Sequence, residues 1–250
     1  MNILNDGLLY HLVNKYHVVS GEWQYFALLL SFVIASIAVS YLLGSINSAI
    51  IISRVFYGED VRTKGSGNAG LTNMLRNYGK KGALLTLFGD VAKTVVAILF
   101  TALLLGFNYN HGISLNDGYC YMSGLFVALG HVFPIYYKFK GGKGVLVTAI
   151  TAIILTPVPA LILILLFVAI VAVSKYVSLG SVCAAMLYPV VVSGYVNFFF
   201  GAKLPGILAL CIILLAILIV WCHRENLKRI SQRTENKLSF KKKKNDDEEG

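Results

Sequence analysis

Long apolar runs restrict the fold of this chain more than any other feature. Hydrophobic residues make up 57% of its 250 residues and charged residues only 14%, and the runs are apolar on every side of a helix. A bilayer core about 30 Å thick needs about 20 apolar residues per transmembrane helix. The sequence therefore predicts an all-α integral membrane protein with about seven transmembrane helices, at residues 26–53, 83–106, 119–137, 145–156, 158–174, 179–200 and 206–222.

The fourth and fifth predicted spans are short because a proline pair divides one apolar stretch. The string Thr156-Pro157-Val158-Pro159 interrupts residues 145–173. Proline lacks the backbone N–H and clashes with the preceding helical turn. The stretch is therefore either one long kinked helix or two short helices that meet at a tight turn.

Basic residues gather in three polar segments between the apolar runs, residues 54–81, 138–143 and 224–244. Cytoplasmic loops of membrane proteins carry an excess of Lys and Arg. Seven spans with the N-terminus outside place all three segments, and the C-terminus, on the cytoplasmic side, whereas six spans would translocate the last one. This rule explains the net charge of +10 without nucleic acid as a partner.

One membrane-embedded domain, residues 26–240, is expected between an N-terminal extension, residues 1–25, and a disordered charged tail, residues 241–250. Four cysteines lie scattered in apolar runs without a C-x-x-C pair, which indicates buried apolar residues and no metal site.

Within the spans, Asp90 and Lys93 are one helical turn apart, either as an interfacial pair or as part of a site. The small residues at 44–48 indicate close helix packing or a cavity wall.

The string Gly65-Ser66-Gly67-Asn68-Ala69-Gly70 lies in the first basic segment. It has the letters of a dinucleotide fingerprint, but no strand precedes it, so that interpretation fails. Glycines still allow several backbone N–H groups to face one anion, which favours a phosphate-binding loop. The groups expected to bind phosphate are Gly65, Gly67 and Gly70 and the side chains of Ser66, Asn68, Thr72, Asn73 and Arg76.

A second loop, Gly141-Gly142-Lys143-Gly144, stands where a new helix begins. It lacks the spacing of a Walker A loop, but a helix N-terminus with free N–H groups binds anions, and Lys143 would add a full charge. His223 and Asn226 follow the last span on one helix face, where they could orient a polar substrate and move a proton, or simply cap the span. His131 is either catalytic or, more commonly for such a position, a satisfied helix-end histidine.

These strings together resemble a known family, the bacterial membrane acyl-phosphate:glycerol-3-phosphate acyltransferases of the PlsY type. The matching segments follow the family's order and cover roughly residues 26–240. They are residues 41–46, 65–73, 87–93, 130–134, 138–144, 176–179 and 223–226.

The resemblance implies a seven-helix enzyme of the bacterial cell membrane that needs no metal or other cofactor. Its substrates would be glycerol-3-phosphate and an acyl phosphate, which implies an upstream enzyme that makes the acyl phosphate. By motif position, the second phosphate loop would hold Lys143 with Gly141, Gly142 and Gly144. The first would hold Ser66, Asn68, Thr72, Asn73 and Arg76. His223 and Asn226 complete the site, with Ser66 and Lys143 counted among the catalytic residues. Departures from the family pattern are Asn47 for Pro, Leu71 for Ala and Thr94 for Gly.

The expected reaction acylates the 1-hydroxyl of glycerol-3-phosphate and gives lysophosphatidic acid and inorganic phosphate. Phosphate is a good leaving group and no serine or cysteine has a dedicated base, so direct transfer without an acyl-enzyme is predicted. The base is either His223 or a phosphate oxygen of the substrate. A transporter for a phosphorylated solute is the alternative, but a transporter places its ligands near the midplane, whereas these donors gather on one face.

Overall fold

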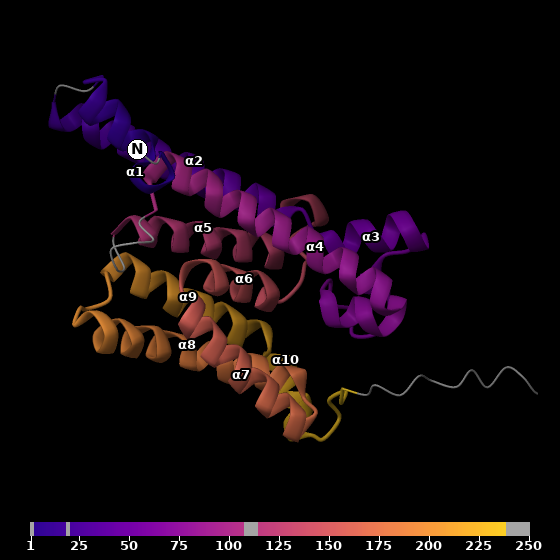
Figure 1. Cartoon of the computed structure of the whole chain (residues 1–250). Coiled ribbons are helices and arrows are strands. Elements are labelled where there is room, and N and C mark those ends of the chain that lie inside the picture. Colours follow the sequence, from indigo (N-terminus) through magenta and orange to yellow (C-terminus); the bar gives the residue numbers. More distant parts are fainter. Residues whose placement is uncertain (1–2, 19–20, 108–114, 239–250) are drawn as a thin grey trace, which may run out of the picture.

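The computed structural model describes residues 3–18, 21–107 and 115–238, and every regular element in these ranges is helical. The long helices lie roughly side by side as a bundle (Figure 1). The elements are α1 (Ile3–Tyr10), the π-helix η1 (His11–Lys15), α2 (Glu22–Ser45), α3 (Ser48–Tyr57), the 3₁₀-helix η2 (Val61–Thr63), α4 (Leu71–Leu105), α5 (Leu115–Val132), the 3₁₀-helix η3 (Ile135–Tyr137), α6 (Val145–Leu155), α7 (Pro157–Ser174), α8 (Val177–Phe200), α9 (Gly206–Cys222) and α10 (Arg224–Ser231).

Each of the seven predicted apolar segments contains a helix, and most of these helices are long enough to cross a bilayer. Among the described residues, five spans pass by length and composition, and the bent pair α9–α10 makes a sixth. The exception is α6, which has 11 residues and rises only about 16 Å, roughly half of a bilayer core.

The proline pair separates two helices and does not kink one. Helix α6 ends at Leu155 and α7 begins at Pro157, so Thr156 alone joins them. Proline suits the first position of a helix because its missing N–H would have no partner there. The hydroxyl of Thr156 lies 2.6 Å from the Tyr121 hydroxyl of α5, which holds the turn inside the bundle. Of the two alternatives, the tight turn is confirmed.

The first and second spans differ from their predicted bounds. The predicted span 26–53 is interrupted after Ser45, and Asn47 starts α3 by accepting a hydrogen bond from the Ile50 N–H at 3.1 Å. Helix α4 begins at Leu71, twelve residues before the predicted residue 83, but Gly79 has non-helical φ +70° and ψ −167° and divides it into a short first part and the long part that contains the predicted span. The apolar pattern marks the long apolar part of α4 but not its more polar first turns, although Asn73 and Met74 in them are buried.

Small and charged residues inside the spans serve packing. A Cβ atom on Gly44 would lie 2.3 Å from the Val127 carbonyl oxygen, so α2 and α5 touch at their backbones. Lys93 contacts Asp90 at 2.8 Å and donates to the carbonyl oxygens of Gly44 and Ile46 at the end of α2. Both charged side chains are buried, so they do not extend to the surface of the protein, and neither lines the cavity described below.

The part of the N-terminal extension that the structure describes packs on the end of α4. The Phe107 N–H donates to the Leu4 carbonyl at 2.8 Å, and α2 already begins at Glu22. The predicted tail, residues 241–250, lies outside the described residues. In Figure 1, α3, α10 and the segment joining α5 to α6 lie at one end of the bundle, opposite α1. The two glycine-rich loops are therefore at the same end.

Candidate active site

A cavity of about 450 Å³ opens at the end of the bundle that carries both glycine-rich loops. Its walls come from the first turns of α4 and α6, from α7 and α8, and from the α9–α10 junction. Of the predicted site residues, those that line it are Ser66, Asn68, Gly70, Thr72, Asn73, Arg76, Lys143, Gly144, His223 and Asn226. The predicted residues outside its walls are Gly65, Gly67, Gly141 and Gly142.

Asn73 shapes the first glycine-rich loop from within. Its Oδ1 accepts the Ser66 N–H at 3.0 Å, and its Nδ2 donates to the carbonyls of Val61 at 3.1 Å and Lys64 at 3.0 Å. Gly65 has φ +57°, and a Cβ there would lie 2.4 Å from Asn73 Oδ1, so only glycine fits this turn. The Asn73 amide thus holds the loop in shape at the wall of the cavity.

The start of α4 presents donors without partners to the cavity. Among the described residues, no hydrogen bond is found from the backbone N–H of Leu71 or Thr72, and no hydrogen bond or ion pair from the Arg76 guanidinium. A helix N-terminus carries roughly half a positive charge and free N–H groups, which suit an anion. Arg76 adds a fork of donors that matches phosphate oxygens.

The second loop uses its glycines for close packing. The N–H groups of Gly141 and Gly142 donate to the carbonyls of Val132 at 3.1 Å and His131 at 3.0 Å. A Cβ atom on Gly142 would lie 2.1 Å from His131 Nε2. These two N–H groups therefore bond carbonyl groups of α5 in this structure, and neither glycine lines the cavity. Gly144 and the N-terminus of α6 stay at the cavity wall.

Lys143 supplies the charge of this loop. Its Nζ donates to Asn226 Oδ1, so the second loop is joined to α10. Burial lowers the pKa of Lys143 to about 8, although the nearby Glu235 carboxylate opposes the shift. The ammonium group is therefore poorly hydrated, and a phosphate group in the cavity would meet a strong, partly desolvated charge.

His223 lies at the junction of α9 and α10 with a defined tautomer. Its Nδ1 is 2.8 Å from the Ile219 carbonyl oxygen, which can only accept, so Nδ1 carries the hydrogen and Nε2 keeps a lone pair. His131 also lines the cavity, and its Nδ1 lies 3.0 Å from Lys93 Nζ. Nδ1 of His131 thus has a partner in Lys93, whereas Nε2 of His223 keeps a lone pair that can accept a proton.

The deeper half of the cavity is apolar. It lies between α6, α7 and α8, and the side chains facing it are mostly small or aliphatic. Examples are Ala152, Ala160, Leu163 and Ala185, with Tyr188 at the far side. An apolar arm that continues from a cationic mouth fits a molecule with a phosphate head and a hydrocarbon chain.

Comparison with known proteins gives the decisive observation. The family model described as glycerol-3-phosphate acyltransferase matches residues 34–233. The chain belongs to this family. Curated members from Coxiella burnetii (strain CbuG_Q212) and Paraburkholderia phytofirmans are 36% identical over 209 residues and 34% identical over 205 residues. These alignments cover 83% and 82% of this chain and 98% and 90% of the relatives.

Two solved structures resemble this acyltransferase over 83% of its length. Both are PlsY (YgiH), an integral membrane glycerol 3-phosphate acyltransferase. The glycerol 3-phosphate form has a TM-score of 0.71 and 31% sequence identity, and the match covers 96% of that structure's chain. The lysophosphatidic acid form has a TM-score of 0.68 and 29% sequence identity, and the match covers 95% of its chain. The chain is therefore a multi-pass integral membrane protein of lipid biosynthesis.

The acyltransferase also has cavity residues that the sequence did not reveal. Glu235 Oε1 accepts from Asn226 Nδ2 at 2.7 Å and from the Ser178 hydroxyl at 2.9 Å, and Oε2 accepts from Arg229 Nε at 2.8 Å. Arg229 could have been found, because it follows Asn226 by three positions on the same helix face. Glu235 could not, because it reaches the site only where the chain folds back and the Leu238 N–H bonds the Lys175 carbonyl.

The acidic groups at this site do not gather into a metal centre. Among the described residues, no group of three or more His, Cys, Asp or Glu side chains could hold a metal ion. Glu235 instead binds Asn226, Ser178 and Arg229. These hydrogen bonds lower the pKa of Glu235, although burial acts against the shift, so the carboxylate is negative at neutral pH and fixes the amide that contacts Lys143.

Proposed function

We propose that this acyltransferase moves an acyl group from an acyl phosphate to the 1-hydroxyl of glycerol-3-phosphate. The hydroxyl oxygen forms the new ester bond to the acyl carbon, and the bond from that carbon to the phosphate oxygen breaks. The products are lysophosphatidic acid and inorganic phosphate, which carries the proton lost by the hydroxyl once transfer is complete. No acyl-enzyme intervenes.

One observation carries this proposal: a single cavity joins two cationic helix N-termini to an apolar arm. Both substrates bring a phosphate group, and the acyl phosphate also brings a hydrocarbon chain. The starts of α4 and α6, with Arg76 and Lys143, offer two places for phosphate. The two solved relatives, named for glycerol 3-phosphate and lysophosphatidic acid, support the acceptor and the product.

The arrangement suits direct transfer because the acyl phosphate is already activated. The site needs mainly to align two reactants and to stabilise the oxyanion that forms on the acyl carbon. Nε2 of His223 can take the hydroxyl proton, and free N–H groups of the helix N-termini can stabilise negative charge. Among the described residues, no cavity serine is hydrogen-bonded to a histidine; Ser178 and Ser181 bond Glu235 and the Val177 carbonyl. This supports a mechanism without a serine nucleophile.

The test uses purified protein in detergent or a lipid mesophase, with glycerol-3-phosphate and palmitoyl phosphate. Release of inorganic phosphate is measured with and without the acceptor, and palmitoyl-CoA is the parallel donor. We expect release that depends on glycerol-3-phosphate and no transfer from CoA. Transfer from palmitoyl-CoA would refute the donor, and no turnover by folded protein with either donor would favour transport of a phosphorylated solute.

Single substitutions assign the two phosphate places. Arg76→Ala removes the charge at the α4 end and Lys143→Ala the charge at the α6 end. If each end holds one substrate, each variant raises the KM of a different substrate, by about tenfold or more for a lost charge-assisted contact. Equal effects of both variants on both substrates would contradict two separate places.

A further inference from the structure

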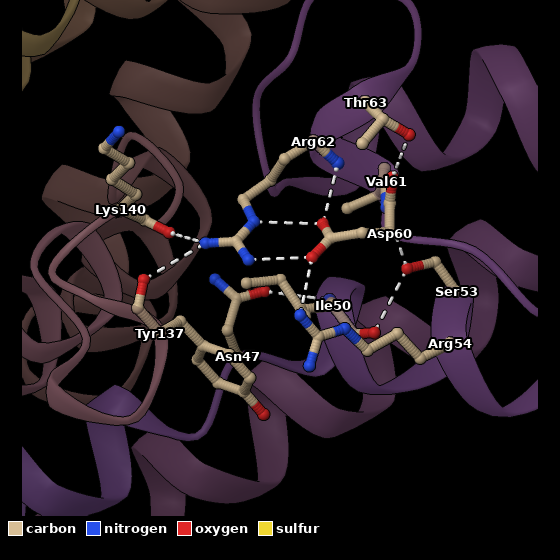
Figure 2. A network of polar contacts seen from close by, with 10 residues as sticks. All are labelled: Asn47, Ile50, Ser53, Arg54, Asp60, Val61, Arg62, Thr63, Tyr137 and Lys140. Atoms are coloured by element: carbon tan, nitrogen blue, oxygen red, sulfur yellow. Dashed lines mark hydrogen bonds and ion pairs between the residues drawn. The ribbon is translucent and has the colours of Figure 1, made fainter.

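A hydrogen-bonded group outside the cavity connects the two glycine-rich loops (Figure 2). Its centre is Arg62, in the short helix η2, three residues before the first loop. Nε and Nη2 of Arg62 donate to the two carboxylate oxygens of Asp60 at 2.9 and 2.7 Å, and the Arg62 backbone N–H donates to Asp60 Oδ1 at 3.0 Å. The guanidinium is therefore fixed in direction by its own segment of chain.

The remaining nitrogen of the same guanidinium reaches the other loop. Nη1 of Arg62 donates to the carbonyl oxygens of Tyr137 at 3.1 Å and Lys140 at 2.9 Å. Figure 2 shows the guanidinium between the Asp60 carboxylate and these two carbonyls. Lys140 is the residue directly before Gly141, so this contact holds the base of the second loop.

The connection is suited to setting a distance. A bidentate pair of ionised groups has a narrow geometry and is stronger than neutral hydrogen bonds. Both side chains are shielded, with 23% exposure for Arg62 and 16% for Asp60, so solvent weakens the pair little. Asp60 stays ionised because hydrogen bonds from Arg62 hold its pKa far below the usual range. Asp60, Arg62, Tyr137 and Lys140 do not line the cavity.

We propose that Asp60 and Arg62 act as a positioning clamp that sets the spacing between the two phosphate-binding loops. This inference rests on the proposed function, in which each reactant's phosphate occupies one end of the cavity. Because the clamp touches neither reactant, it acts through the loops: the first through residues 63–70 and the second through Lys140 and Gly141.

Loss of the clamp should lower kcat more than it changes KM, because each loop keeps its own phosphate-binding groups. In Arg62→Gln, both helix N-termini, Arg76 and Lys143 remain, so we expect each KM to change by no more than about threefold. The reactants lose their relative alignment, and a misplacement near 1 Å can lower the rate about 100-fold. We therefore expect kcat to fall about 10- to 100-fold. Arg62→Lys keeps the positive charge but not the forked pair of donors, so its kcat should lie between those of the unmodified protein and Arg62→Gln.

Arg54→Gln is the matched control. Arg54 donates to the same Asp60 oxygen, Oδ2, at 2.8 Å, so the control also removes one cation from that carboxylate. Arg54 makes no hydrogen bond to the second loop among the described residues, although its guanidinium lies over the Tyr137 ring. We expect kcat within about twofold of the unmodified protein, since a more exposed ion pair contributes little. An equal loss in both variants would overturn the clamp.

A distance measurement tests the clamp without relying on turnover. Spin labels on cysteines introduced at the exposed positions Lys64 and Tyr136, with the four native cysteines replaced by alanine, report the spacing between the loops. We expect Arg62→Gln to widen the distance distribution and Arg54→Gln to leave it unchanged. Unchanged distributions in both variants, with the melting temperature retained, would refute the clamp. Absent turnover in the unmodified protein would instead refute the proposed function.

Discussion

Lys143 combines a full charge with a partly buried setting between the second loop and α10. Its pKa of about 8 means that the ammonium form dominates below that pH and is lost as the pH rises. The profile of kcat/KM reports groups of the free enzyme. We expect kcat/KM to fall about tenfold per pH unit above about pH 8, because the neutral amine binds phosphate poorly.

The comparison for this prediction is Lys143→Arg. A guanidinium does not deprotonate in this range, so the variant should lack the alkaline decline even if its maximal rate is lower. Phosphate release measured from about pH 6 to about pH 10 checks both proteins. The same alkaline decline in Lys143→Arg would show that another group titrates.

Single residues also mark the limit of what the sequence could predict. The sequence motifs that predict a polar site contain Lys143, Arg76 and His223, and all three line the cavity. Gly141 and Gly142 stand in the same strings, but their N–H groups bond α5, which only the packing of the loop reveals. Glu235 has no local pattern, because its partners come from α8 and α10.

Close packing of the second loop on α5 makes Gly142 sensitive to substitution. The Cβ of Gly142→Ala would lie 2.1 Å from His131 Nε2 and 2.7 Å from the Ala69 carbonyl oxygen. We expect the loop to shift and kcat/KM to fall roughly tenfold or more. The control is Gly194→Ala on the exposed face of α8, where no atom lies within 4 Å. It should keep full activity and melt no lower, since alanine favours a helix by about 1 kcal/mol. Equal activity in both variants would contradict the packing argument.

Helix α8 gives a test of the apolar arm. Ala185 is buried at the cavity wall, and its neighbour Met186 is exposed on the outer face. Ala185→Phe would fill space that acyl methylenes occupy, and excluding two of them, at about 0.8 kcal/mol each, lowers affinity about tenfold. We expect that loss for palmitoyl phosphate and little change for acetyl phosphate. Met186→Phe should behave as the unmodified protein, and an unaffected Ala185→Phe would refute the arm.

The apolar pattern predicted the helices well and their ends poorly. Apolar runs show where a chain enters hydrocarbon, but α3 and the first turns of α4 are polar or half-exposed. The break before α3 follows from the cap at Asn47, and its end follows from Gly58 in a left-handed conformation. Both are recognised helix-end signals, but the apolar run continues through Asn47 and hides the first of them.

For the whole molecule, the basic residues at the cavity end predict the orientation in the membrane. We expect that end to face the cytoplasm. In Cys-free protein, Lys140→Cys should react with a membrane-impermeant maleimide only after the cells are permeabilised. Lys203→Cys, in the exposed segment between α8 and α9, should react in intact cells. The reverse pattern would invert the topology and place the site outside.

The short length of α6 has a consequence for how substrates and products enter and leave the enzyme. Helix α6 stops at Leu155, and the wall beside it is formed by the apolar helix α7, whose cavity-lining residues Ile164 and Val168 are exposed. The arm therefore borders on hydrocarbon. Under the proposed function, the lipid product would leave sideways into the adjoining leaflet, while glycerol-3-phosphate and phosphate would exchange with water at the mouth. If the donor is the proposed acyl phosphate, its encounters with the enzyme would take place by diffusion in two dimensions, and the hydrocarbon chain would not need to cross water in either direction.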